Sequence, residues 1–129
     1  MNVGSWKLAL AALLAVLLVA CAQPVRNVDG VQVVASKPDH SLEDVTLAIR
    51  RAAGALGWRT EVESPGHVVA SIALRTHTAS VDIRYTTQRY SIQYRDSTNL
   101  GYDGTNIHKN YNGWIQNLER DINFHLGAM

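Results

Sequence analysis

The sequence has 129 residues, which is enough for one domain of modest size, with 12 Lys and Arg side chains against 11 Asp and Glu. This near balance of charge gives no electrostatic basis for attracting nucleic acid, so we expect no nucleic-acid partner. Cys21 is the only cysteine. An intramolecular disulfide is therefore excluded, and packing together with backbone hydrogen bonds has to stabilise the fold.

The first 20 residues have the pattern of an export signal. Lys7 is the only charged side chain before Cys21, and the run from Leu8 to Leu18 consists entirely of Leu, Ala and Val. A charged start followed by an apolar run of this length is typical of a signal peptide, whereas a membrane-spanning helix needs about 20 apolar residues. We therefore expect residues 1–20 to be a removable signal peptide.

The residues Leu18-Val19-Ala20-Cys21 resemble the lipobox of bacterial lipoproteins. The resemblance implies cleavage before Cys21, a diacylglyceryl group on its thiol and an acyl chain on its new amino terminus. We expect these covalent lipids and no cofactor or metal, and two or three acyl chains make membrane attachment effectively permanent. Ala22 stands where Asp is typical of inner-membrane retention, so the resemblance implies the periplasmic face of the outer membrane. An uncleaved signal-anchor helix with a buried Cys21 is the alternative.

Residues 21–40 are expected to form the lipidated N-terminus and a tether. The segment is rich in Pro, Asn, Asp, Gly and Ser, and the pair Asp29-Gly30 indicates a turn. This pair is followed by Val31, Val33 and Val34, which could form an additional N-terminal edge strand.

A single globular domain is expected over residues 41–126, and an amphipathic helix begins it. Ser41 can accept a hydrogen bond from the exposed backbone amides of the helix start. Gly57 can end the helix in a left-handed conformation, and Trp58 can fold back onto the last turn. Between these ends, apolar residues recur at steps of three and four on one face: Leu42, Val45, Ile49, Ala52, Ala53 and Leu56.

Four segments of alternating apolar and polar residues follow the helix. Antiparallel pairing about the short turns between them brings the apolar residues together on one face of a sheet. The expected cross-strand pairs are Val62 with Val68, Ile72 with Val81, and Ile83 with Ile92. The opposite face collects Arg59, Glu61, Ser71, Asp82, Arg84, Gln93 and Arg95. Its arginines could bind an anionic partner, but the acids among them favour a solvated, mutually neutralising face.

Residues 96–106 are expected to be a polar connection to a second amphipathic helix that Thr105 or Asn106 caps. The apolar face of this helix consists of Ile107, Tyr111, Trp114, Ile115, Leu118 and Ile122. Covering the sheet with both helices gives an α+β two-layer sandwich, in which a four-stranded antiparallel meander follows the order α-β-β-β-β-α. The aromatic residues expected in its core, rather than on a platform for bases or sugars, are Tyr85, Tyr90, Tyr94 and Trp114.

The densest collection of functional side chains lies at the end of the fourth strand and in the connection after it. Loops on a rigid sheet are where binding sites usually lie. The candidate binding residues are Arg95, Asp96, Ser97, Asn99, Tyr102, Asp103 and His108. The alternative is that these residues only form turns and cap the second helix. We expect no metal site, because the histidines lack metal-binding spacing and the connection lacks the EF-hand pattern.

Two stretches resemble a set of small uncharacterised lipoproteins from proteobacteria. They are Tyr90-Ser91-Ile92-Gln93-Tyr94-Arg95-Asp96-Ser97 and Ile107-His108-Lys109-Asn110-Tyr111-Asn112-Gly113-Trp114-Ile115. The resemblance also includes Gly57-Trp58 and Pro65-Gly66-His67, and it covers roughly residues 41–122. It implies a periplasm-facing lipoprotein domain, but it implies no particular activity for this chain.

The leading hypothesis is a membrane-anchored, non-enzymatic binding or assembly-accessory module of the cell envelope. Its expected partners are the membrane, through the lipid anchor, and an envelope protein. A small envelope hydrolase that uses the loop 95–108 is the alternative, with Ser97 as nucleophile, His108 as base and an Asp to orient it. No G-x-S-x-G motif surrounds Ser97, however. A third hypothesis is a domain that only buttresses a larger membrane complex.

Overall fold

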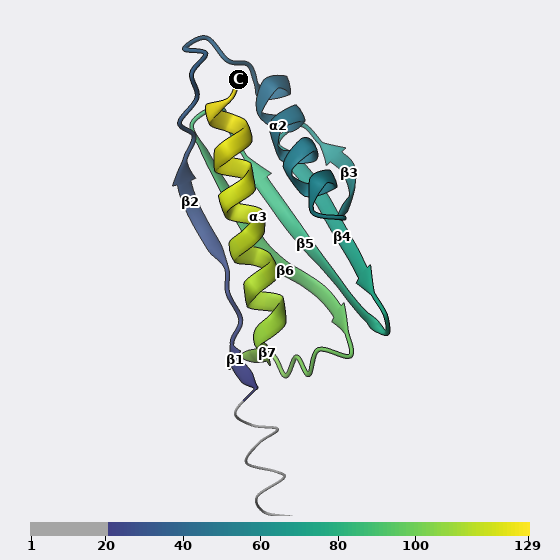
Figure 1. The fold of residues 1–129 in the computed structure, drawn as a ribbon. Coiled ribbons are helices and arrows are strands. Elements are labelled where there is room, and N and C mark those ends of the chain that lie inside the picture. The colour runs from purple at the N-terminus through teal and green to yellow at the C-terminus, as the bar shows by residue number, and fades with distance from the viewer. Residues whose placement is uncertain (1–20) are drawn as a thin grey trace, which may run out of the picture.

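The computed structural model describes residues 21–129, and the expected signal peptide, residues 1–20, lies outside the described part. Two helices and seven strands make up residues 21–129 (Figure 1). In chain order they are β1 (Ala22–Pro24), β2 (Val28–Gln32), α2 (Leu42–Ala55), β3 (Arg59–Ser64), β4 (His67–Leu74), β5 (His77–Tyr85), β6 (Arg89–Thr98), β7 (Asn106–His108) and α3 (Lys109–Gly127).

Five of the strands form one antiparallel sheet in the order β2-β6-β5-β4-β3, and β1 pairs with β7 in a separate two-stranded sheet. The two helices lie side by side on one face of the larger sheet (Figure 1). The α+β class and the two helices are thereby confirmed. The expected four-stranded meander corresponds to β3 through β6, but the sheet has a fifth strand, β2, at its edge.

The cross-strand register agrees with the sequence at two of three positions. Val62 pairs with Val68, and Ile83 pairs with Ile92, as expected. Ile72 pairs with Ala79, so the expected partner Val81 was wrong by two residues. The cause is that the turn lies one residue earlier than the expected Thr76-His77, since Leu74 pairs directly with His77 and only Arg75 and Thr76 connect them. A shift of two residues keeps every side chain on its own face, so the apolar residues remain on the face of the sheet that the helices cover.

Strand β6 continues to Thr98, so the expected polar connection begins later than residue 96. The register changes within this strand, because Val81 pairs with Tyr94 whereas Ser80 pairs with Asp96. Arg95 is therefore the extra residue of a β-bulge. The bulge ends the apolar alternation at Tyr94, and it explains why the sequence pattern suggested a loop where the chain still forms ladder hydrogen bonds.

Most of the segment that was expected to be a tether is bound to the domain. Strand β2 pairs with β6, with Val28 opposite Ile92 and Val31 opposite Tyr90. The pair Asp29-Gly30 between these positions is a bulge within the strand and not a turn between elements. An additional edge strand is thus present, but it spans Val28–Gln32, so Val33 and Val34 lie beyond its end. Val28 is buried by its pairing against the core.

Helix α2 has the expected ends. The amide of Asp44 donates to Ser41 Oγ at 3.1 Å, and the amide of Ser41 donates back to the Asp44 carboxylate at 2.9 Å. This reciprocal capping box satisfies two exposed donors at the helix start. At the other end, Gly57 and Trp58 donate to the carbonyl oxygens of Gly54 and Ala53, which is a Schellman motif.

Helix α3 begins later than expected, since His108 caps it in place of Thr105 or Asn106. The reason is that Asn106 and Ile107 belong to β7, where they pair with Pro24 and Gln23. A residue whose backbone pairs in a strand cannot also start a helix. Because the partner strand lies more than 80 residues earlier in the chain, no local sequence signal indicates this boundary.

The hydrophobic core lies between the helices and the covered face of the sheet. Ile83, at the centre of β5, is fully buried, and of the expected core aromatics Tyr85 and Tyr90 are buried, whereas Tyr94 and Trp114 are partly covered. Residues without any solvent exposure include Val45, Ile49, Val68, Val81, Ile92, Ile115, Leu118 and Ile122. Full burial of one such side chain contributes about 1.5–3 kcal/mol, so this layer holds the fold together.

Candidate binding surface at the Cys21 end of the domain

Cys21 directly precedes β1, and its backbone is fixed to the first residue of α3. The amide of Lys109 donates to the Cys21 carbonyl oxygen at 2.9 Å, and Ala22 pairs with His108. The Cys21 side chain is partly exposed. The expected lipidation site therefore lies at the end of the domain where α3 begins, with no flexible residues between it and the fold.

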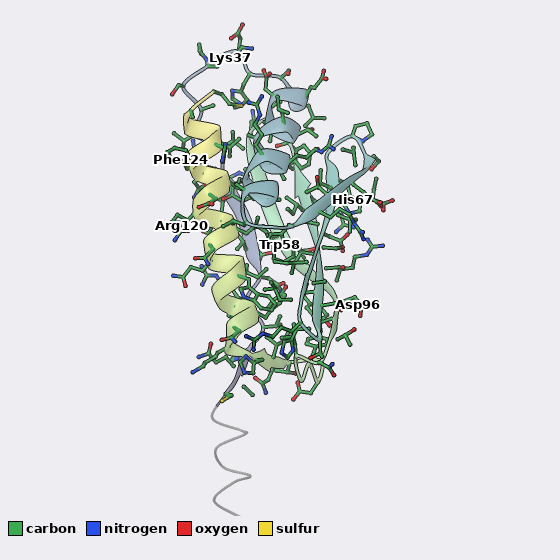
Figure 2. All side chains as sticks on the ribbon, turned by 45° about the vertical axis from the view of Figure 1, so that its right-hand side comes forward. Lys37, Trp58, His67, Asp96, Arg120 and Phe124 are labelled. Atoms are coloured by element: carbon green, nitrogen blue, oxygen red, sulfur yellow. The ribbon has the colours of Figure 1, made fainter. Side chains whose placement is uncertain are left out.

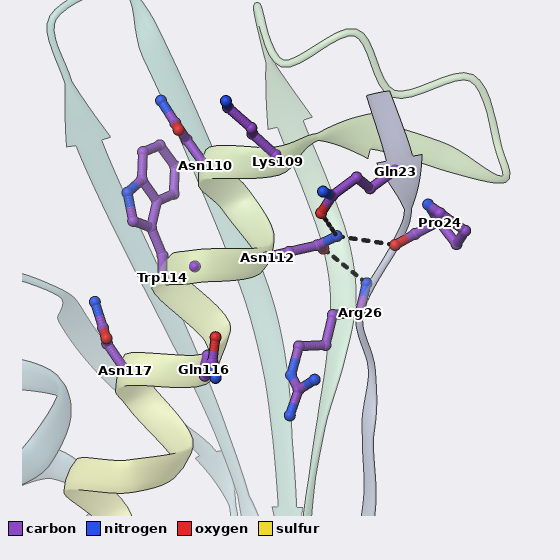
Figure 3. Close-up of a pocket in the computed structure, with 10 residues that line it drawn as sticks. Gln23, Pro24, Arg26, Lys109, Asn110, Asn112, Trp114, Gln116 and Asn117 are labelled. Carbon is purple, nitrogen blue, oxygen red and sulfur yellow. Dashed lines mark hydrogen bonds between the residues drawn. The ribbon is translucent and has the colours of Figure 1, made fainter. Parts of the chain in front are cut away.

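Asn112, in the first turns of α3, binds the chain that follows Cys21. Its Oδ1 accepts a hydrogen bond from the Arg26 amide at 2.8 Å (Figure 3). Its Nδ2 donates to the Pro24 carbonyl at 2.9 Å and to Gln23 Oε1 at 3.4 Å. One side chain thus contacts three residues of the N-terminal segment. The sequence did not single out this role, because these partners are more than 85 residues away from Asn112 in the chain.

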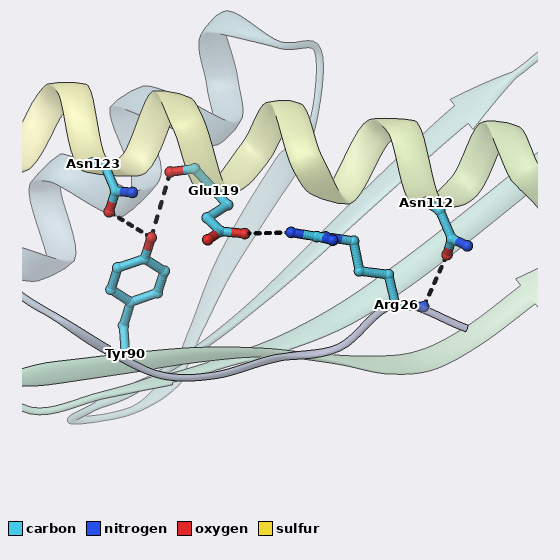
Figure 4. A network of polar contacts seen from close by, with 5 residues as sticks. All are labelled: Arg26, Tyr90, Asn112, Glu119 and Asn123. Carbon is cyan, nitrogen blue, oxygen red and sulfur yellow. Dashed lines mark hydrogen bonds and ion pairs between the residues drawn. The ribbon is translucent and has the colours of Figure 1, made fainter. Parts of the chain in front are cut away.

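A second set of contacts, further along α3, binds Arg26 of the same segment and Tyr90 of strand β6. The Arg26 guanidinium donates to the Glu119 carboxylate at 3.1 Å (Figure 4). The Tyr90 hydroxyl, on the adjoining strand β6, donates to Asn123 Oδ1 at 2.6 Å. Burial, and next the charge of Glu119, raise the pKa of Tyr90 far above its ordinary value. The hydroxyl therefore remains a protonated donor at any physiological pH.

An open hollow of about 700 Å³ lies beside this N-terminal segment and the first turns of α3 (Figure 3). Its lining contains Trp114, two cations and several amide side chains, and no carboxylate. Uncharged amides offer both donors and acceptors, so the hollow is suited to polar, hydroxylated or anionic groups. Besides Asn112, helix α3 contributes three amide side chains to the lining, those of Asn110, Gln116 and Asn117.

The candidate residue Asn99 connects two loops at the same end of the domain. Its Nδ2 donates to the Thr76 carbonyl at 2.9 Å, and its own carbonyl oxygen lies 2.7 Å from His77 Nδ1. Its φ of +58° is uncommon for a residue other than glycine, but Asn tolerates this conformation better than most residues do. Asn99 thus joins the β4–β5 hairpin tip to the connection between β6 and β7.

The candidate residues Tyr102 and Asp103 stabilise that connection from within. The Tyr102 ring stacks on the ring of Tyr94. The Asp103 carboxylate accepts hydrogen bonds from the amides of Thr105 and Asn106 at 2.9 and 2.7 Å. These backbone hydrogen bonds, first that of Asn106 and then that of Thr105, hold the pKa of Asp103 below its ordinary value. Both side chains therefore also have a structural role.

The residues of the hydrolase alternative have other partners in the fold. Ser97 Oγ lies 2.7 Å from the Tyr94 hydroxyl. His108 Nδ1 accepts a hydrogen bond from the Asn110 amide at 3.1 Å, as an N-cap. Asp96 accepts a hydrogen bond from the Ser97 amide at 2.9 Å. Within residues 21–129, no hydrogen bond joins Ser97 to His108, and the arrangement lacks the nucleophile-to-base contact that such chemistry requires.

The candidate residue Arg95 belongs to a different cluster, on the uncovered face of the sheet. Arg95 Nη1 donates to Asp82 Oδ1 at 2.8 Å, and His67 Nε2 lies 2.7 Å from the same oxygen. His67 lies on the side of the sheet away from α3 (Figure 2). Burial raises the pKa of Asp82, but the hydrogen bonds from His67 and Arg95 lower it by more, so it lies below its ordinary value. On this face, Asp82 is thus paired with Arg95 within the fold.

The structure therefore brings Asn99, Tyr102, Asp103 and His108 together at the Cys21 end and places Arg95 elsewhere. Residues 21–129 contain no group of three or more metal-ligating side chains, and neither α2 nor α3 is long and apolar enough to cross a bilayer. No family model, curated protein or solved structure matches the chain.

Proposed function

We propose that this chain is the precursor of a bacterial lipoprotein, cleaved before Cys21 and attached to the periplasmic face of the outer membrane by lipid on that residue. The lipobox pattern Leu18-Val19-Ala20-Cys21 and the apolar run before it support the proposal. The observation that carries it is the position of Cys21, partly exposed and directly before β1. The whole domain from β1 to α3 lies C-terminal to the proposed cleavage point.

Metabolic labelling with a fatty-acid analogue tests this proposal. We expect the parent chain to be labelled and to lose about 20 residues by mass, because only a thiol can form the thioether that precedes cleavage. Cys21→Ser should remain unlabelled and full length. Ala22→Ser, at the exposed neighbouring position, is the matched control and should be labelled like the parent. Equal labelling of parent and Cys21→Ser would exclude the lipid anchor.

We further propose that the anchored domain is a non-enzymatic binding or assembly-accessory module of the envelope. The hydrogen bonds of Ser97 and His108 within the fold support this proposal, because they leave neither group arranged as a nucleophile or a base. The surface offers instead an amide-lined hollow along α3.

Photo-crosslinking in intact cells tests the module. A photoreactive residue in place of Gln116, in the hollow, should give one defined protein adduct. The control has the photoreactive residue in place of Glu61, on the uncovered sheet face, and should not give this adduct. Absence of a defined adduct at Gln116, or equal adducts at both positions, would count against a protein partner in the hollow. Turnover of a generic ester substrate that Ser97→Ala abolishes would favour the hydrolase.

A further inference from the structure

We infer that the end of the domain that carries Cys21 rests on the lipid headgroups in one fixed orientation. The inference depends on the proposed lipidation of Cys21. For a lipoprotein with a long flexible tether, the anchor says nothing about how the domain faces the bilayer. Here the lipid-bearing residue is hydrogen-bonded to α3 through Lys109, at 2.9 Å, and the next residue is already paired in β1.

The N-terminal segment is also too firmly bound to act as a hinge. Its three residues in β1 pair with β7, and Asn112 binds the backbone at Pro24 and Arg26. The ion pair between Arg26 and Glu119 adds a further contact at 3.1 Å. Only the rotatable bonds of Cys21 itself therefore separate the lipid from rigid structure.

Three segments around Cys21 form one continuous surface. The tip of the β4–β5 hairpin, the connection from residue 99 to 105 and the β1–β7 pair all lie at the end where α3 begins (Figure 1). Asn99 links the first two of these through its hydrogen bonds to Thr76 and His77. The amide of Val25 donates to the Thr105 carbonyl at 2.9 Å and links the last two. We call this surface, residues 21–24, 74–77 and 99–108, the anchored end.

The side chains of the anchored end are compatible with a headgroup layer. Leu74 and Tyr102 are among the few large apolar residues that are exposed, at 45% and 39%. Tyrosine is enriched where proteins meet the membrane–water interface, because its ring is apolar and its hydroxyl is polar. Arg75, and Lys109 directly beside this surface, are exposed cations that can approach lipid phosphates. The Asp103 carboxylate accepts hydrogen bonds from two backbone amides. The loop that the sequence favoured for binding would thus meet lipid headgroups.

The same geometry places the opposite end of the domain far from the bilayer. Helix α3 has 19 residues and begins at the anchored end, so its length of about 28 Å separates the two ends. Lys37 lies at the opposite end, near the C-terminus (Figures 1 and 2). A protein partner would consequently reach the sides of the domain and its far end, and not the connection from residue 99 to 105.

Site-specific fluorescence quenching of the mature lipoprotein in vesicles tests the orientation. Since Cys21 is the only cysteine and lipid blocks its thiol, one introduced cysteine can be labelled uniquely. Thr76→Cys and Thr105→Cys place a dye at the anchored end, and Lys37→Cys places it at the far end; all three positions are exposed. The vesicles contain phosphatidylethanolamine and phosphatidylglycerol, with a nitroxide quencher on the headgroups.

We expect strong quenching at positions 76 and 105 and none at 37. Insertion of a Gly/Ser linker of about twelve residues between Cys21 and Ala22, with a reach of roughly 19 Å, should remove this difference. Two results would overturn the fixed orientation if mass spectrometry finds lipid on Cys21. They are equal quenching at both ends without the linker, and no quenching at either end. Absence of lipid on Cys21 would overturn the proposed anchor itself, and the orientation with it.

Discussion

The ring of Tyr102 stacks on the ring of Tyr94, with centroids 3.9 Å apart and an angle of 29° between the planes. Tyr94 in turn makes an edge contact with Tyr111, whose ring is 5.7 Å away on α3. Strand β6, the connection after it and α3 thus meet through a row of aromatic rings. The connection after β6 is therefore attached to the core by Tyr102, even though this side chain is partly exposed.

Replacing Tyr102 should consequently affect folding. Tyr102→Ala should lower the free energy of unfolding by about 1–2 kcal/mol, because the stacked pair and its buried area are lost. Tyr102→Phe should stay close to the parent, since the hydroxyl makes only a 3.5 Å contact with the Gly104 carbonyl. Urea denaturation of the Cys21→Ser form of residues 21–129 measures both. An unchanged stability of Tyr102→Ala would show that the connection is independent of the core.

A second prediction compares neighbouring residues on opposite faces of β5. Ile83 is fully buried, whereas Arg84 is exposed on the uncovered face. Ile83→Asp should destabilise by several kcal/mol, because a carboxylate without a partner would be buried, and Arg84→Ala should cost less than roughly 1 kcal/mol. Thermal melts of the same soluble form would check the difference. The reverse order of stability would mean that the helices cover the other face.

Strands β3 to β6 could be predicted from the sequence because their apolar residues alternate as far as Tyr94. Alternation places residues on faces whether or not the exact partner is known, which is why the shifted pairing of Ile72 did not alter the predicted core. The short strands β1 and β7 have no such pattern. They pair with each other although more than 80 residues of the chain separate them, as Gln23 and Ile107 show. Such a pairing cannot be inferred from local propensity.

The candidate site was predictable only in part, for the same physical reason. A concentration of Asp, Asn, Ser and Tyr did indicate the connection after β6, and the structure places Asn99 and Tyr102 there. Local pattern could not distinguish their roles as internal contacts from roles in binding. Asn112 resembles any polar residue on the surface of a helix, although it binds the segment next to Cys21.

A third prediction concerns two glycines with left-handed backbones. Gly66 has φ +81°, and a Cβ there would lie 2.7 Å from the Tyr85 carbonyl oxygen, whereas a Cβ at Gly101, with φ +63°, would meet nothing within 4 Å. Both changes to Ala carry the backbone cost of about 1–2 kcal/mol. Gly66→Ala adds a steric clash and should be less stable than Gly101→Ala by a further 1–3 kcal/mol or so. Matched urea denaturation curves decide, and equal curves would contradict the close approach.

The last prediction is a pH dependence that arises from His40. Its Nδ1 lies 2.9 Å from the Lys37 carbonyl oxygen, and its Nε2 lies 2.6 Å from that of Thr87. Two acceptors facing both ring nitrogens favour the imidazolium, because the neutral ring can donate from only one nitrogen. The hydrogen bond to Thr87, and next that to Lys37, therefore raise the pKa of His40 above its ordinary value, with smaller help from the charges of Asp44 and Asp39.

Because the folded pKa of His40 is raised, the stability that it contributes is fully present below the unfolded pKa of about 6.5 and is lost as the pH rises through the folded pKa. His40→Gln cannot titrate, so the difference in unfolding free energy between parent and variant should be largest near pH 5.5 and should shrink by about pH 8. Urea denaturation at both pH values measures it, and an NMR titration of the His40 ring gives the pKa directly. A difference that grows toward alkaline pH would mean that His40 is bound as the neutral ring.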